Sequence, residues 1–180
     1  MVDRVCGRTG ATGNRARVCG RVAGDGASWV WGDEFMGGYA GDIEPEAAWT
    51  LMREEGGLLV DVRTPPEWSF VGQVDATGIA GGAGDPVLLP WQDYPSMQVN
   101  PAFADQLEAE LDRRGLGRDV PLAFLCRSGV RSLAAANAMA GRGYGRAYNI
   151  AGGFEGVPDG DGHRGRVNGW KVAGLPWRQG

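Results

Sequence analysis

Short apolar segments alternate with helical segments along most of the chain. Three of the segments between them have helical signals, with proline or asparagine starting the first two and glycine ending each: 44–57, 100–117 and 132–143. Apolar runs too short for helices indicate strands at 58–62 (LLVDV) and 120–126 (VPLAFLC). Short strands are also expected at 87–90 (VLLP) and in 147–153 (AYNIAGG), where a glycine turn follows the strand. Strands that alternate with helices form βαβ units. The sequence therefore predicts an α/β fold with a parallel sheet covered on both faces.

The second helical segment has the most complete set of boundary signals. Asn100 is expected to be its N-cap and Pro101 its first residue, and arginines precede Gly115 at its end. The third helix is expected to begin near Ser132. Both assignments depend on local signals alone.

The first part of the chain differs in composition from the rest. Residues 1–28 are rich in glycine and arginine and have few large apolar side chains to offset the entropy of folding. We expect residues 1–36 to be poorly structured and residues 37–180 to form one domain. With 180 residues, 43% of them hydrophobic, the chain has enough material for one substantial core.

Charge and cysteine content exclude several classes of function. The net charge of −4 provides no basic face for nucleic acid or an anionic membrane, and no apolar stretch approaches the length of a membrane span. A cytoplasmic location is expected. The three cysteines, Cys6, Cys19 and Cys126, have no disulfide spacing, and His163 is the only histidine, so we expect reduced thiols and neither a metal nor a cofactor.

Cys126 ends a predicted buried strand and is followed by a polar loop, CRSGVRS. A free cysteine is often only a small core side chain. Here, however, the turn would direct backbone N–H groups inward, and the next helix would add its positive N-terminal end. This field would hold an anion and favour thiolate over thiol. The candidate nucleophile is Cys126, and the candidate anion-binding residues are Arg127, Ser128, Gly129, Val130 and Arg131.

With its surroundings, this loop resembles the rhodanese family of sulfurtransferases over residues 42–177. The resemblance also rests on VDVRTPPEW, which contains Asp61, Arg63 and Glu67, and on NIAGGFEG followed by GW and AGLPW. Gln73 stands where many relatives have histidine. The resemblance implies a single rhodanese-like domain with a central parallel sheet of about five strands. It also implies ping-pong transfer of a sulfane sulfur through a Cys126 persulfide, with residues 127–131 holding the anionic donor.

Asp61 and Arg63 lie two residues apart at the end of a predicted strand, so their side chains point the same way. We expect them to form a supporting ion pair. A direct contact with the substrate is the alternative.

Two other functions remain open for this pattern. Cysteine-dependent phosphatases and arsenate reductases also hold a thiolate in an amide cradle, but phosphatase loops of this kind are one residue longer than the one between Cys126 and Arg131. A non-catalytic or sensing module for protein interaction is the second alternative. For the enzyme, the expected partners are thiosulfate or a persulfide as donor and a thiol, cyanide or a protein as acceptor.

Overall fold

The centre of the domain is a parallel sheet of five strands. The computed structural model describes residues 38–77, 79 and 83–179. The strand order in the sheet is β1-β8-β7-β2-β4, and every neighbouring pair is parallel. In that order, the strands are Gly41–Ile43, Ala147–Ile150, Leu122–Leu125, Leu58–Asp61 and Val87–Leu88.

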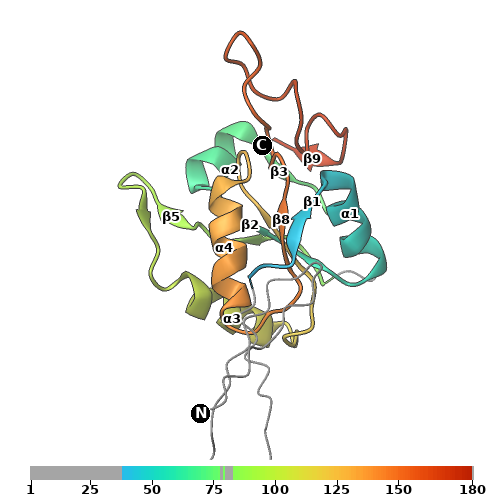
Figure 1. The fold of residues 1–180 in the computed structure, drawn as a ribbon, viewed down its shortest axis with the longest axis vertical. Coiled ribbons are helices and arrows are strands. Elements are labelled where there is room, and N and C mark those ends of the chain that lie inside the picture. Colours follow the sequence, from blue (N-terminus) through green and yellow to red (C-terminus); the bar gives the residue numbers. More distant parts are fainter. Residues whose placement is uncertain (1–37, 78, 80–82, 180) are drawn as a thin grey trace, which may run out of the picture. The chain divides into compact units, whose positions relative to one another are not determined.

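Four helices accompany this sheet: α1 (Pro45–Glu54), α2 (Pro65–Val71), α3 (Phe103–Arg113) and α4 (Val130–Ala140). Successive residues of β2 point to opposite faces, so Val60 contacts the core under α3 and α4 while Leu59 contacts the core under α1. Figure 1 shows α4 and α1 on opposite sides of the strands. The expected parallel sheet of about five strands with helices on both faces is therefore confirmed.

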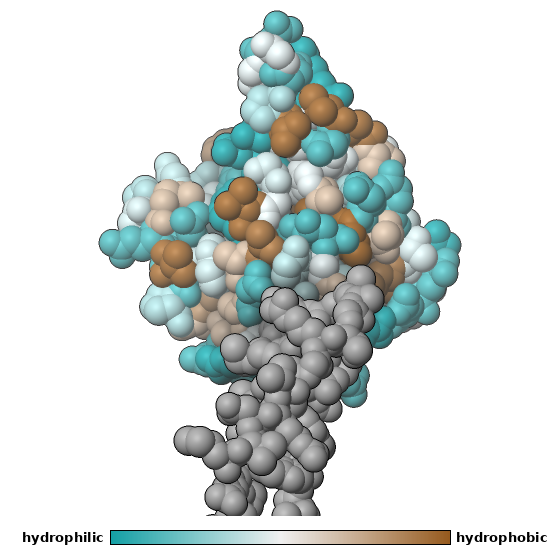
Figure 2. Space-filling view, viewed as in Figure 1, coloured by the Kyte–Doolittle hydropathy of each residue, from teal (hydrophilic) through white to brown (hydrophobic). Residues whose placement is uncertain are grey.

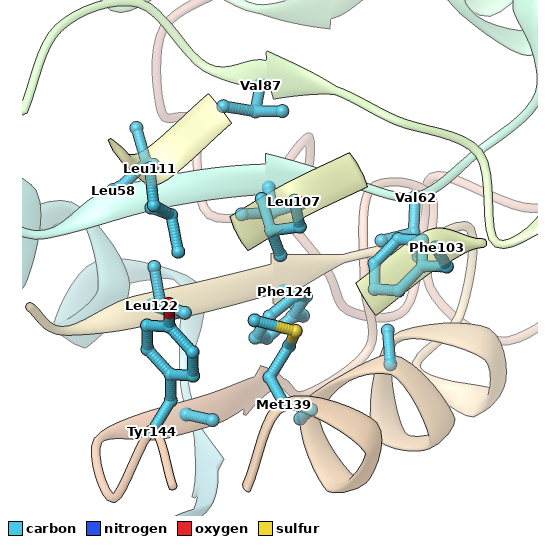
Figure 3. Close-up of a cluster of buried hydrophobic side chains, with 14 of the residues drawn as sticks. Leu58, Val62, Val87, Phe103, Leu107, Leu111, Leu122, Phe124, Met139 and Tyr144 are labelled. Carbon is cyan, nitrogen blue, oxygen red and sulfur yellow. The ribbon is translucent and has the colours of Figure 1, made fainter. Parts of the chain in front are cut away.

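Two hydrophobic clusters fill the space on either side of the sheet. The larger one joins α3, α4, β2 and β7 (Figure 3), and its central side chains are Phe103, Leu107, Leu122, Phe124 and Met139. The second cluster joins α1 to the other face of the sheet and takes in Phe154 and Trp170 from the segment after β8. Both faces of the sheet are therefore packed, and the packing holds the central strands in place.

Two small antiparallel sheets complete the described structure. Strand β3 (Gln73–Val74) pairs with β9 (Trp177–Arg178), which returns the end of the chain to the region just after α2. Strand β5 (Gln92–Asp93) pairs with β6 (Gln98–Val99) in a hairpin that lies apart from the main sheet (Figure 1).

The helix boundaries correct two expectations. Helix α3 begins at Phe103, and its N-cap is Ala102 instead of Asn100. Asn100 instead closes the preceding turn, because its side-chain oxygen accepts a hydrogen bond from the Ala102 amide at 3.0 Å. Helix α4 begins at Val130, two residues before Ser132, because Gly129 adopts a φ of 107° and serves as its N-cap. The cysteine loop is correspondingly short.

One face of the described structure carries both polar and apolar side chains. Figure 2 shows apolar areas on this face that are separated by polar side chains. No helix within the described ranges combines the length and apolar character that crossing a bilayer requires. The segment expected to be poorly structured, residues 1–36, lies outside the described residues.

Candidate active site

Cys126 directly follows β7, the middle strand of the five. The chain then turns within three residues into α4, so the cysteine lies at the carboxyl end of a central parallel strand. Loops at this edge of an open α/β sheet commonly carry the reactive groups. The Cys126 side chain is only 1% exposed and packs against the larger hydrophobic cluster.

Two hydrogen-bond donors surround the sulfur of Cys126. The Gly129 amide nitrogen lies 3.1 Å from Sγ, and the Ser132 hydroxyl oxygen lies 3.2 Å from it. Gly129 reaches this position with a left-handed backbone conformation that other residues adopt at a cost. Both donors would favour a negatively charged sulfur.

The other amides of the loop are open. Within the part of the chain that the structure describes, the backbone N–H groups of Arg127, Ser128, Val130 and Arg131 have no acceptor from the protein. The last two belong to the first turn of α4, where N–H groups have no partner within the helix and carry the positive end of its dipole. This arrangement can bind an anion beside Sγ.

The turn after β8 makes backbone hydrogen bonds to the cysteine loop. The Phe154 amide donates to the Cys126 carbonyl at 2.8 Å, and the Glu155 amide donates to the Arg127 carbonyl at 3.0 Å. Gly153 makes this approach possible, because a Cβ atom at that position would lie 2.7 Å from the Ser128 nitrogen. The sequence NIAGG, singled out in the resemblance, thus packs directly against the loop.

Arg131 forms an ion pair with Glu67 of α2. The two side chains form a bidentate pair, with Arg131 nitrogens 2.7 and 2.8 Å from the Glu67 oxygens. Glu67 also accepts hydrogen bonds from the backbone and hydroxyl of Thr64, which completes the capping box of α2. Burial opposes ionisation of Glu67, but the hydrogen bonds from Arg131 and Thr64 outweigh it and lower its pKa to about 2. The pair therefore ties the start of α2 to the start of α4.

Arg127 differs from Arg131 in its surroundings. Its side chain is exposed, and it forms no ion pair with any residue in the described ranges. Its neighbour Val130 is also exposed, at 75%. Arg127 is thus the cation of the loop whose charge is not already neutralised by a carboxylate.

Asp61 and Arg63 lie beneath this edge of the sheet and pair with each other. Both side chains are buried, and the closest nitrogen and oxygen are 2.6 Å apart. Arg63 also donates to the Gly72 carbonyl at 2.8 Å, and its guanidinium lies 4.1 Å from the centre of the Phe154 ring. No hydrogen bond to Cys126 is made by either residue. Through these contacts, the pair links the end of α2 to the turn after β8.

One group of possible metal ligands in the described residues does not include any residue of the cysteine loop. The ligand atoms of Asp159, Asp161 and His163 are within 4.8 Å of one another on the C-terminal segment. The Asp159 carboxylate already accepts hydrogen bonds from the amides of Asp161 and His163 and from Arg166. This pattern is that of a loop closed by an aspartate side chain.

Two contacts at the candidate site were not predicted from the sequence. The pairing of Arg131 with Glu67 joins residues that are 64 positions apart. The contact of Ser132 with Cys126 requires a helix that begins at Val130, because only then does the serine lie in the first turn and face back to the loop. The Ser132 contact could have been anticipated from Gly129, since glycine directly before a helical pattern is a possible N-cap.

Comparison with known proteins shows a matching family model and similar sequences. A family model described as rhodanese-like domain matches residues 44–158. Among curated proteins, RP600 of Rickettsia prowazekii (strain Madrid E) is 34% identical over 134 residues, which cover 71% of this chain and 88% of that protein. The thiosulfate sulfurtransferase GlpE of Actinobacillus succinogenes is 29% identical over 135 residues, covering 75% of this chain and 87% of the relative.

Among solved structures, the crystal structure of Rv0390 from M. tuberculosis matches with a TM-score of 0.66 and 43% sequence identity. The match covers 79% of this chain and 99% of that one.

Proposed function

The chain belongs to the rhodanese-like domain family, and we propose that it is a sulfurtransferase that carries a sulfane sulfur as a persulfide on Cys126. The observation that carries this proposal is the position of Sγ, 3.1 Å from the Gly129 amide and beside open amides at the start of α4. A sulfurtransferase among the relatives supports the same class of reaction.

The proposed reaction has two steps. In the first, the Cys126 thiolate attacks the outer sulfur of the donor. The sulfur–sulfur bond of the donor breaks, and its electron pair leaves with the donor remnant, which is sulfite when the donor is thiosulfate. In the second, the acceptor attacks the outer sulfur of the persulfide, and the electron pair of that bond returns to Sγ. Every group these steps need is part of the chain, so the proposal requires neither a metal nor a cofactor.

The loop residues have different proposed roles. The amides of Ser128, Gly129 and Val130 stabilise the persulfide anion, and Arg127 attracts the anionic part of the donor. Arg131 was expected to bind the donor directly. Because Glu67 neutralises its side chain, we propose that Arg131 mainly fixes the loop and contributes its amide. Asp61 and Arg63 support the site from below.

A small anionic sulfur donor fits this charge distribution, and thiosulfate is the first candidate because a relative is named for its use. A persulfide is the alternative donor. A thiol, cyanide or a protein thiolate would serve as acceptor. The reaction needs a reduced cysteine, so we propose a cytoplasmic location.

The test is intact-protein mass spectrometry after treatment with thiosulfate. We expect one added sulfur on the wild-type protein and its loss on addition of cyanide. Cys126→Ser should abolish both the added mass and sulfur transfer, because a serine hydroxyl does not ionise near neutral pH. Cys6→Ser and Cys19→Ser are the matched controls and should behave as the wild type. A folded protein with a reduced Cys126 that gains no sulfur from thiosulfate, persulfide or polysulfide would contradict the proposal.

A further inference from the structure

We propose that the hydroxyl of Ser132 is a catalytic group that donates its hydrogen bond to Cys126 Sγ when this sulfur becomes a thiolate. This inference rests on the proposed function for its role in turnover. The hydrogen bond itself can be tested without sulfur transfer.

The geometry gives the single proton of Ser132 two acceptors. Its hydroxyl oxygen lies 3.1 Å from the Gly129 carbonyl oxygen and 3.2 Å from Cys126 Sγ. Ser132 is fully buried and Cys126 nearly so. In such a site, water competes weakly for either acceptor, and the choice depends on which one carries more negative charge.

Helical hydroxyls often donate to a carbonyl one turn earlier, and that contact alone would indicate no function. Thr50 of α1 is an example in this chain, because its hydroxyl donates to the Glu46 carbonyl at 3.0 Å. Ser132 differs by having the reactive sulfur as a second acceptor. A hydrogen bond to a charged acceptor is about twice as strong as one to a neutral acceptor, so the proton should move to Sγ when Sγ is ionised.

This exchange follows the two proposed steps. In the persulfide, Sγ is bonded to Cβ and to the outer sulfur and carries little charge, so Ser132 donates to the Gly129 carbonyl. When the acceptor takes the outer sulfur, the sulfur–sulfur bond breaks and its electron pair stays on Sγ. Ser132 then turns to the new thiolate and, with the Gly129 amide, stabilises it as the leaving group.

Within the described residues, the hydroxyl of Ser132 makes no hydrogen bond to the charged groups around Cys126. Arg131 on α4 is paired with Glu67 on α2, and Arg63 after β2 is paired with Asp61 at its end. Arg127 is exposed beside the cysteine. Removing the hydroxyl of Ser132 therefore takes away one neutral hydrogen-bond donor and leaves the charged residues around Cys126 in place. The change in Cys126 reactivity then measures the contribution of that donor.

The first measurement is the rate of Cys126 alkylation by iodoacetamide as a function of pH. Ser132→Ala removes one oxygen at a helix position where alanine is the most favourable residue, so the fold should persist and Tm serves as the check. We expect the midpoint of the pH profile to rise by about one unit, which corresponds to the loss of one hydrogen bond to a charged group. Thr50→Ala is the matched control and should leave the midpoint unchanged.

The second measurement separates the two steps at a pH above both midpoints. Transfer of sulfur from the preloaded persulfide to cyanide should slow roughly three- to tenfold in Ser132→Ala, because the leaving thiolate has lost a donor. Loading from thiosulfate should be unchanged or slightly faster, since a more basic thiolate is a better nucleophile. A merely structural role would affect both steps alike.

An unshifted alkylation midpoint in folded Ser132→Ala, or equal slowing of loading and unloading, would overturn the inference. If the wild type transfers no sulfur but the midpoint still shifts, the hydrogen bond to the thiolate stands and the proposed sulfurtransferase activity fails.

Discussion

The two arginines of the cysteine loop differ because only Arg131 pairs with Glu67. The carboxylate holds Arg131 in a bidentate pair and caps α2 through Thr64, so one side chain orients two helices. Arg127 makes no such pair within the described residues and faces solvent beside Cys126. At the level of single residues, anion attraction and loop positioning are therefore separate functions.

The lowered pKa of Glu67 predicts a pH-dependent contribution to stability. Its folded-state value of about 2 lies below the usual 4.5, so the stabilisation is fully present above pH 4.5 and is lost as the pH falls toward 2. Glu67→Gln should lower the free energy of unfolding by about 1 to 2 kcal/mol at pH 7, after allowance for partial exposure. Urea titrations of both proteins should show this difference constant above pH 5 and shrinking below pH 4. A difference that stays constant down to pH 2.5 would contradict the assignment.

Helix α2 is held by its two ends. None of its residues is fully buried, and its apolar contact with the second hydrophobic cluster is made by Val71 at its end. Its start is tied to α4 by the pair of Glu67 with Arg131. At its end, the carbonyls of residues 70–72 accept hydrogen bonds from Gln179, Lys171 and Arg63. Polar contacts from α4, from the C-terminal segment and from Arg63 just before the helix therefore supplement limited apolar packing, and they place α2 next to the cysteine loop.

The turn after β8 also packs against the backbone of the cysteine loop. Substitution of Gly153 tests how much this contact contributes to stability. Gly153→Ala would bring a Cβ within 2.7 Å of the Ser128 nitrogen, so the loop backbone must shift. Gly174→Ala is the matched control, because both glycines have positive φ, at 59° and 67°, but Gly174 has open space around its Cβ position. We expect the control to cost about 1 kcal/mol in unfolding free energy from backbone strain alone.

Gly153→Ala should cost at least about 2 kcal/mol more than that control, as overpacking against backbone does. It should also reduce alkylation and sulfur loading of Cys126, whereas Gly174→Ala should not. Equal losses of stability in the two variants, measured by chemical denaturation, would show that the contact behind the loop is unimportant.

The elements that could be predicted from the sequence are those with a buried face. Strand β7 is a continuous apolar run, β2 is apolar up to Asp61, and β8 is mostly buried despite Asn149. Helices α1 and α3 have periodic apolar residues with helix start and stop signals. Helix α2 has no fully buried residue, and β3 and β9 pair only two residues each across more than half of the chain. Local patterns do not contain that information.

The same distinction applies to the site. The loop from Cys126 to Arg131 is contiguous, so its composition alone predicts an anion-binding turn. The partner of Arg131 lies on another helix, and its choice depends on how α2 and α4 are placed. The Ser132 contact depends on the first residue of α4, which is the kind of boundary that sequence patterns locate least well.

At the scale of the whole molecule, the parallel sheet accounts for the location of the site. All five strands run the same way, so the loops after β2, β7 and β8 emerge at one edge. The ion pair of Asp61 and Arg63, the cysteine loop and Gly153 belong to these three loops. Segments that are distant in sequence thus meet around Cys126 because of the direction of the strands.

The last prediction concerns the extent of the domain. The sheet runs from β1 to β8, between residues 41 and 150, and the first described anchors are the Tyr39 and Ala40 amides, which donate to Asn137 and Ala147. We propose that residues 1–36 lie outside the folded domain. A shortened chain that begins at Met36 should melt within about 2 °C of the full chain, because a larger shift would require loss of roughly 0.5 kcal/mol or more. It should also gain sulfur on Cys126 at the same rate, measured by mass spectrometry. A marked fall in Tm or in the loading rate would show that the 35 removed residues contribute to the fold.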